Sequence, residues 1–314
     1  MTTQPANISV TDPISAAMGR VGQVLFRPFD LDKWFTIGFC AWLALLGEHG
    51  ISTGANFNFN SDHSWQRDLH QQLHAVREFV TANLFWLAPV AAVVMLASLV
   101  LWVLFLWLSS RGKFMFLHCV ALDRAQVVEP WGRFAACADS LFWFRLALGL
   151  IGWIVTLPLV LLLVLSVWWA VSQENARLPG ILGALALGCA LFLIGLAFAL
   201  VRKLTTDFVV PIMFLRGSRC LAAWGEFGRL CAAHFGHFIL YLLFQLIIGL
   251  VLGILVFILV IATCCLAGCL LALPYLGTVA LLPVLVFKRA YSLHYLAQFG
   301  RAYDVFPPAQ PPVL

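Results

Sequence analysis

The chain has 314 residues, of which 62% are hydrophobic and only 11% carry a charged side chain. About a quarter of the residues of an ordinary soluble domain are charged, so this composition excludes that class and predicts an integral membrane protein. The net charge of +5 is not accompanied by a nucleic-acid-binding motif, which favours anionic lipid headgroups as partners and argues against nucleic acid.

The first predicted element is an amphipathic helix that begins near residue 12. Asp12 can cap this helix, and Pro13 can occupy its first position. Its apolar stripe consists of Ile14, Ala17, Met18, Val21 and Leu25. We expect the helix to lie in the headgroup plane at the cytoplasmic face, with packing against other inner-face helices as the alternative.

The next segment, 34–47, is apolar but only 14 residues long, whereas about 20 are needed to cross the hydrocarbon. If it crosses, sixteen basic residues lie on one side of the membrane and three, Arg67, Arg77 and Arg177, on the other; if it does not, the division is thirteen to six. The positive-inside bias therefore predicts a crossing and two cytoplasmic termini. The first thirty residues lack the apolar core of a cleavable signal, so we expect a retained anchor.

Longer apolar stretches follow at 84–108, 146–171 and 181–201, and a run without any charge covers 238–287. At ~1.5 Å per residue the last run would be ~75 Å long as a single helix, so it must fold back once. The reversal is expected near 263–268. Together with segment 34–47, the sequence predicts about six transmembrane helices in three hairpins.

The chain also repeats itself at an interval of 93 residues. The motif Trp-Gly-x-Phe at 131–134 recurs at 224–227, and each copy precedes a long hairpin. Trp131 and Trp224 are therefore expected to be structural, each filling the same notch between its inner-face helix and the following hairpin. In the third copy the inner-face stripe consists of Trp224, Phe227, Cys231, Phe235 and Phe238.

The expected fold is all-α: a polytopic membrane helix bundle in which a cytoplasmic-face amphipathic helix precedes each hairpin. The single membrane domain covers 1–303, with repeats at 13–108, 109–201 and 202–287, and 304–314 forms a proline-rich disordered tail. Gly249 and Gly253 form a GxxxG face, a structural feature that permits close helix packing.

Two groups of residues have spacings that suit a metal ion. His70, His74 and Glu78 recur at i, i+4 and i+8, and imidazole with carboxylate can bind zinc or copper. A solvated polar helix face is the competing explanation. The weaker group, 231–237, contains Cys231, His234 and His237. Acidic residues near the membrane boundaries, Asp207 among them, are expected to form helix caps or ion pairs.

No catalytic motif is present, so we expect neither an enzyme nor a cofactor. No ionisable group lies in the middle of a long apolar segment, where Gln245 is the only amide side chain, and this argues against an ion pump or channel. We expect a non-enzymatic module that organises membrane lipids or another membrane protein. The alternative is a transporter of apolar or amphiphilic solutes, which would require a continuous cavity near Gln245, Tyr275 and Pro158.

Segments 25–31, 33–35 and 38–40 resemble a family of uncharacterised bacterial multi-pass membrane proteins, and segments 223–227 and 290–293 strengthen the likeness. A more distant likeness, in the repeated inner helix and hairpin, is to the membrane region of some bacterial glycerophosphodiester phosphodiesterases. The resemblance implies a location in the bacterial cytoplasmic membrane. It carries over no activity.

Overall fold

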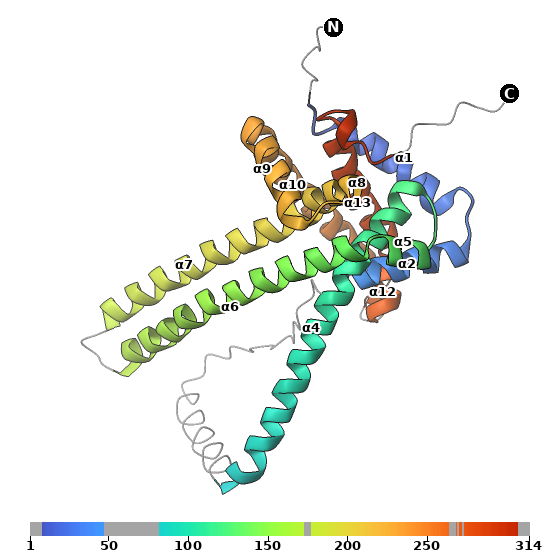
Figure 1. The fold of residues 1–314 in the computed structure, drawn as a ribbon. Helices are drawn as coiled ribbons and strands as arrows, with labels where there is room; N and C mark the ends of the chain where they lie inside the picture. The colour runs from blue at the N-terminus through green and yellow to red at the C-terminus, as the bar shows by residue number, and fades with distance from the viewer. Residues whose placement is uncertain are drawn as a thin grey trace, which may run out of the picture.

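The computed structural model describes residues 8–46, 82–172, 177–263, 268, 270–271 and 273–306. Every element within these ranges is a helix (Figure 1). In chain order they are α1 (Asp12–Phe26), α2 (Leu31–Leu45), α4 (Leu84–Leu122), α5 (Val128–Arg133), α6 (Ala135–Ser172), α7 (Arg177–Leu204), η2 (Thr205–Val209), α8 (Val210–Arg216), α9 (Cys220–Ala233), α10 (Phe235–Ala262), α12 (Pro274–Ala280), α13 (Leu282–Ala297) and η3 (Arg301–Tyr303).

Four helical stretches are long and apolar enough to cross a bilayer. They are Phe85–Leu122, Ala135–Ser172, Leu178–Arg216 and Phe235–Ala262. A fifth span is possible if α12 and α13, which meet at a bend of 64°, count as one. The described residues therefore agree with a helical membrane protein of four or five spans, whereas the sequence predicted about six.

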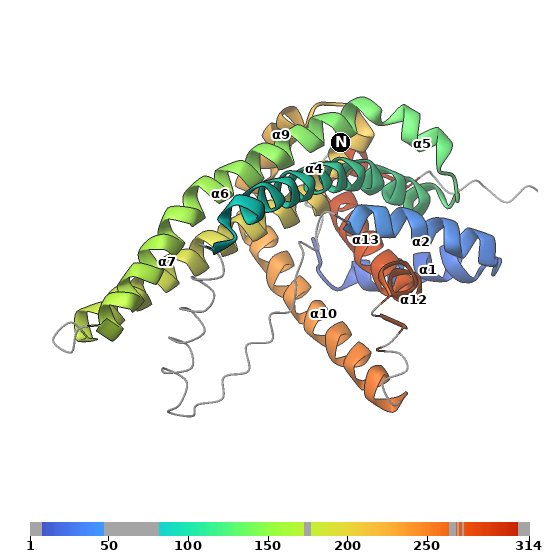
Figure 2. The same ribbon diagram turned by 90° about the horizontal axis from the view of Figure 1, so that it is seen from below.

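Helices α6 and α7 pack side by side, from Gly152 and Phe198 to Ala170 and Gly180, and the long helices otherwise meet mainly at one end. Figure 1 shows α4 and the α6–α7 pair extending away from the packed region in different directions, and Figure 2 shows α10 diverging from α6 and α7. No more than 6% of the most apolar window of each long helix is buried. Apolar surface exposed on this scale is typical of helices that face lipid or another membrane protein.

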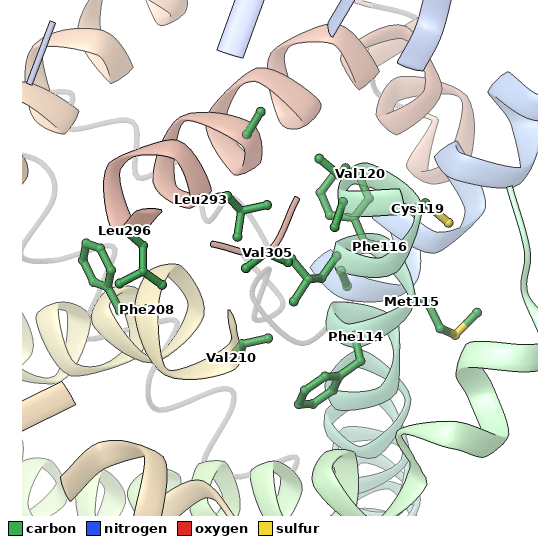
Figure 3. Packing of buried hydrophobic residues seen from close by; sticks show 14 of the residues in the cluster. Phe114, Met115, Phe116, Cys119, Val120, Phe208, Val210, Leu293, Leu296 and Val305 are labelled. Carbon is green, nitrogen blue, oxygen red and sulfur yellow. The ribbon is translucent and has the colours of Figure 1, made fainter. Parts of the chain in front are cut away.

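The hydrophobic core lies where the apolar runs of the long helices end. It joins the second half of α4 to η2, α8 and α13 (Figure 3). Its members include Phe114, Phe116 and Val120 of α4, Phe208 and Val210 around η2, Leu293 and Leu296 of α13, and Val305. The core therefore combines segments from distant parts of the sequence.

Helix α2 runs antiparallel to the second half of α4. Near the start of α2, the Lys33 ammonium lies 2.9 Å from an Asp123 carboxylate oxygen, and near its end the Ser109 hydroxyl donates to the Ala44 carbonyl at 2.8 Å. Gly112 permits this approach, because a Cβ there would lie 2.5 Å from the Ala44 nitrogen. Helix α2 thus covers the second half of α4, which carries its charged residues. It ends beside Ser109, at the C-terminal end of the apolar run 84–108.

Helix α1 packs along α13, mostly as its stripe predicts. Ala17, Val21 and Leu25 are buried, but the prediction is wrong for Met18, which is 60% exposed. Met18 lies at one edge of the stripe, whereas Val24, at the other edge, is buried. The contact between the two ends of the described chain also includes hydrogen bonds of Ser9 with Gln298 and of the Tyr291 hydroxyl with the Val10 carbonyl.

The second and third repeats differ at the junction between inner helix and hairpin. In the second repeat α6 runs unbroken from Ala135, and the separate inner helix is reduced to the six residues of α5. In the third, the backbone leaves helical geometry at His234 and separates α9 from α10. The third repeat has Gly236 where the second has Trp143, and glycine disfavours helix by about 1 kcal/mol.

This difference changes the surroundings of matched side chains. Phe142 is 8% exposed inside α6, whereas its counterpart Phe235 is 63% exposed at the start of α10. The expected stripe of the third inner helix is therefore wrong at Phe235, although Phe227 and Phe238 are buried. The boundary expected at residue 109 also falls inside α4, which continues through it to Leu122.

Arg20 connects α1 to the C-terminal end of α4. Its Nε donates to the Val120 carbonyl at 2.9 Å and its Nη2 to the Ala121 carbonyl at 2.6 Å. These carbonyls belong to the last turn of α4, where no intrahelical donor remains. Burial lowers the pKa of Arg20, and the nearby Asp123 carboxylate opposes that shift.

Replacing Arg20 with glutamine should lower the melting temperature of the detergent-solubilised protein. Hydrogen bonds from a charged donor contribute about 1.5–3 kcal/mol each, and glutamine cannot reach both carbonyls. The matched control is Arg27→Gln, because the Arg27 side chain is exposed. Equal melting temperatures for the two variants would contradict the role given to Arg20.

Candidate functional site

A cavity of about 270 Å³ lies among helices from both halves of the chain, and we call it the basic cavity. Its lining residues are Ala41, Ala44 and Leu45 of α2, Lys113 and Phe116 of α4, Lys203 of α7, Thr206 and Asp207 of η2, Gln245 of α10, and Leu285, Lys288 and Arg289 of α13. Four of these side chains are basic and one is acidic. The lining therefore carries a formal charge of 4 − 1 = +3.

The cations of the basic cavity lie where apolar runs end. Lys113 follows the charge-free stretch 84–110, with only Arg111 and Gly112 between, and Lys203 follows 178–201 after Arg202. Lys288 is the first charged residue after the run that begins at residue 238. Charged side chains avoid hydrocarbon, so in a bilayer the ends of such runs are expected at the level of the lipid headgroups.

A π-helical turn, η2, forms one wall of the basic cavity. Such turns are rare and occur frequently at functional sites. The Lys113 ammonium donates to the Thr206 hydroxyl at 2.6 Å, and the Arg289 guanidinium donates to the Thr206 carbonyl. Helices α4 and α13 therefore hold the π-helical turn from two sides.

A chain of hydrogen bonds crosses the cavity wall and ends at Asp207. Gln245 donates to the Tyr241 hydroxyl at 3.0 Å, and Tyr241 donates to an Asp207 carboxylate oxygen at 3.1 Å. The same oxygen lies 2.8 Å from the Lys203 ammonium. Tyr241 is completely buried, so this chain provides the polar partners that a hydroxyl requires in an apolar core.

Replacing Tyr241 with phenylalanine should lower the free energy of unfolding by about 1–3 kcal/mol. The change removes one hydroxyl and leaves the Gln245 amide and the Asp207 carboxylate without it, and unsatisfied buried polar groups carry that cost. Thermal melting of detergent-solubilised protein would measure the effect.

The control is Tyr275→Phe. The Tyr275 hydroxyl also donates to a protein oxygen, the carbonyl of Phe35 at 3.1 Å, but this bond is exposed to solvent. A loss for Tyr241→Phe no larger than the loss for Tyr275→Phe would contradict a structural role for the hydrogen-bond chain.

A second, more open groove of about 680 Å³ lies between the start of α6 and the segment that leads into α9. It contains Asp139, which forms an ion pair with Arg111 at 3.3 Å, and Cys220. Burial raises the pKa of the Cys220 thiol to about 12, so this thiol is protonated at neutral pH. The groove therefore offers no activated nucleophile at that position.

Of the two predicted metal groups, only the weaker one lies within the described residues. His70, His74 and Glu78 lie outside the described residues. Within the described ranges no three histidine, cysteine, aspartate or glutamate side chains gather closely enough to hold a metal ion, and this covers Cys231, His234 and His237. His234 instead packs its ring against Phe299, with ring centroids 5.4 Å apart.

The matched tryptophans have different aromatic neighbours. Trp131 packs edge to face against Trp107 with its ring beneath the Arg111 guanidinium, whereas Trp224 lies beside Phe144 of α6 and Phe227 of α9. The aromatic contacts of Trp131 therefore come from α4, the helix before its repeat motif. They are not equivalent to those of Trp224.

The GxxxG face of α10 has no close neighbour within the described ranges. A Cβ added at Gly249 or Gly253 would meet no atom within 4 Å. The close helix packing that this face permits therefore stays a prediction.

Sequence reasoning noted Asp207 and Gln245 separately and missed the basic side chains that surround them. Lys113, Lys203 and Lys288 enter the sequence analysis only as three of the sixteen basic residues that predict the topology. Their shared position just after three charge-free runs is the signal that could have found the basic cavity. These residues form one cavity only because α4, α7, η2, α10 and α13 converge around them.

A family of unknown function (DUF7544) matches residues 8–282. The chain belongs to this family. The matched region contains every residue that lines the basic cavity except Leu285, Lys288 and Arg289 of α13. No curated protein matches the chain, and no solved structure matches it.

Proposed function

We propose that the protein is a non-enzymatic module of the bacterial cytoplasmic membrane that organises lipids or a partner membrane protein. The observation that carries the proposal is the separation of the packed core from the long apolar helices, whose most apolar windows are at most 6% buried. In a bilayer such surfaces are covered by lipid or by other transmembrane helices. The protein therefore exposes a large apolar surface on long helices that a packed core holds together.

The proposal includes six crossings with both termini cytoplasmic, supported by the division of basic residues. Helix α2 ends beside Ser109, at one end of the apolar run of α4, and residue 84 lies at the other end. In the proposed arrangement the first crossing is segment 34–47, as the division of basic residues predicts. The distant likeness to the membrane region of glycerophosphodiester phosphodiesterases belongs to this proposal and brings no hydrolase activity with it.

Reporter fusions test this topology. Alkaline phosphatase fused after Ser61 should be active, because the segment before α4 is expected outside, and green fluorescent protein fused at Leu314 should fluoresce, because it folds in the cytoplasm. Equal expression of the fusions is the control. An inactive phosphatase fusion would contradict the six-crossing arrangement.

The proposed function predicts stoichiometric retention without turnover. Protein purified in a mild detergent should retain a defined lipid or one membrane protein in native mass spectrometry, because the apolar faces need a covering. The same preparation should not hydrolyse phosphodiesters or lipid esters. Robust hydrolysis, or the absence of any retained lipid or protein, would refute the proposal.

A transporter of amphiphilic solutes is the second candidate, and the basic cavity beside Gln245 is the observation that favours it. The lining of this cavity includes neither Tyr275 nor Pro158. Of the three residues expected along a transport path, only Gln245 lines the cavity. The transporter is therefore the less favoured function.

A further inference from the structure

We propose that the basic cavity binds a phosphate oxyanion of the kind carried by anionic phospholipids. The inference rests on the proposed function and names the ligand chemistry of a site within that module. The same chemistry is offered by free phosphate, and the experiment below separates the two sources.

Charge is the first argument. The lining carries Lys113, Lys203, Lys288 and Arg289 against one carboxylate, Asp207, which already contacts Lys203 and Tyr241. Lys203 and Lys288 are exposed, so an anion that enters the cavity can reach both ammonium groups. A phosphate group, with its negative charge and several acceptor oxygens, is a suitable ligand for two such cations.

The available donors are the second argument. Lys288 is solvent-accessible and forms no ion pair among the residues that the structure describes, yet it lies close enough to Lys203 and Asp207 for their charges to interact. An ammonium group has three N–H donors, so Lys203 retains donors beyond its contact with Asp207. The two lysines come from different helices and can approach one anion from two sides.

The position of the cavity is the third argument. Its cations mark the level where the apolar runs of α4, α7 and the segment before Lys288 end, which is the level expected for headgroups. The lining also includes apolar side chains, among them Ala44, Leu45 and Leu285. A charged group and an apolar wall in one cavity match the junction of a phospholipid headgroup with its chains.

The volume limits what can enter. Liquid water occupies about 30 Å³ per molecule, so 270 Å³ corresponds to about nine water molecules. This space holds one phosphate and its adjoining glycerol atoms but not a whole lipid. The acyl chains would lie outside, along the exposed faces of the long helices.

Native mass spectrometry of the full chain tests the proposal. Detergent-solubilised protein is given equal amounts of phosphatidic acid and phosphatidylcholine, and the bound fraction of each is measured. Wild-type protein should prefer phosphatidic acid. Lys288→Gln should weaken that binding about tenfold, because one charge-assisted hydrogen bond contributes 1.5–3 kcal/mol and 1.4 kcal/mol is a factor of ten.

Arg202→Gln is the matched control. Arg202 lies beside Lys203 at the same helix end and carries the same charge, but it does not line the basic cavity. Removal of either residue lowers the net charge equally. Melting curves of both variants report folding, and since both side chains are exposed we expect wild-type melting temperatures.

The outcomes separate the sources and the hypotheses. A loss of phosphatidic acid binding in Lys288→Gln but not in Arg202→Gln supports the site. If millimolar inorganic phosphate does not displace the bound phosphatidic acid, the ligand is a lipid phosphate. If inorganic phosphate displaces it, the same site binds a soluble ligand. Equal losses in Lys288→Gln and Arg202→Gln, or no preference for phosphatidic acid, overturn the site. If the protein still retains a defined lipid or membrane protein in that case, the proposed function stands without it.

Discussion

The cost of placing a charge in hydrocarbon determines where the helices of this protein meet. Three long apolar runs, those of α4 and α7 and the one that begins at residue 238, end just before basic residues, and side chains from all three ends line the basic cavity. There the side chains of Lys113 and Arg289 reach η2 instead of pointing into lipid. The packed core forms at this level because the basic side chains find hydrogen-bond partners there and the apolar helix ends can pack against each other.

The sequence predicted the elements that follow from periodicity and hydropathy. The buried stripe of α1, the apolar long helices and the end of α10 just before residue 263 all depend on local patterns. Whether a helix continues past a change in hydropathy depends on tertiary contacts. The repeat boundary expected at residue 109 was based on hydropathy alone, and α4 continues through it. The second half of α4 stays helical because α2 packs along it.

The candidate site was harder to predict because its residues are distant in sequence and similar in type. Asp207 and Gln245 stood out as unusual, but nothing local indicates that Tyr241 joins them. The π-helical turn is held by contacts from α4 and α13, so its presence cannot be read from 205–209 alone. The repeat was also a partial guide, because the two copies are interrupted at different positions: the helix breaks at Phe134 in the second copy and at His234 in the third.

The contact of α1 with α13 has a consequence for the biogenesis of the protein. Ser9 and Val10 bond to Gln298 and Tyr291, so residues nearly three hundred positions apart close the same core. During synthesis the long apolar helices α4, α6 and α7 are complete before α13 exists. Until then they lack the part of the core that α13 supplies. These helices, and the still more apolar α10, therefore have to be stable before the two ends of the chain meet.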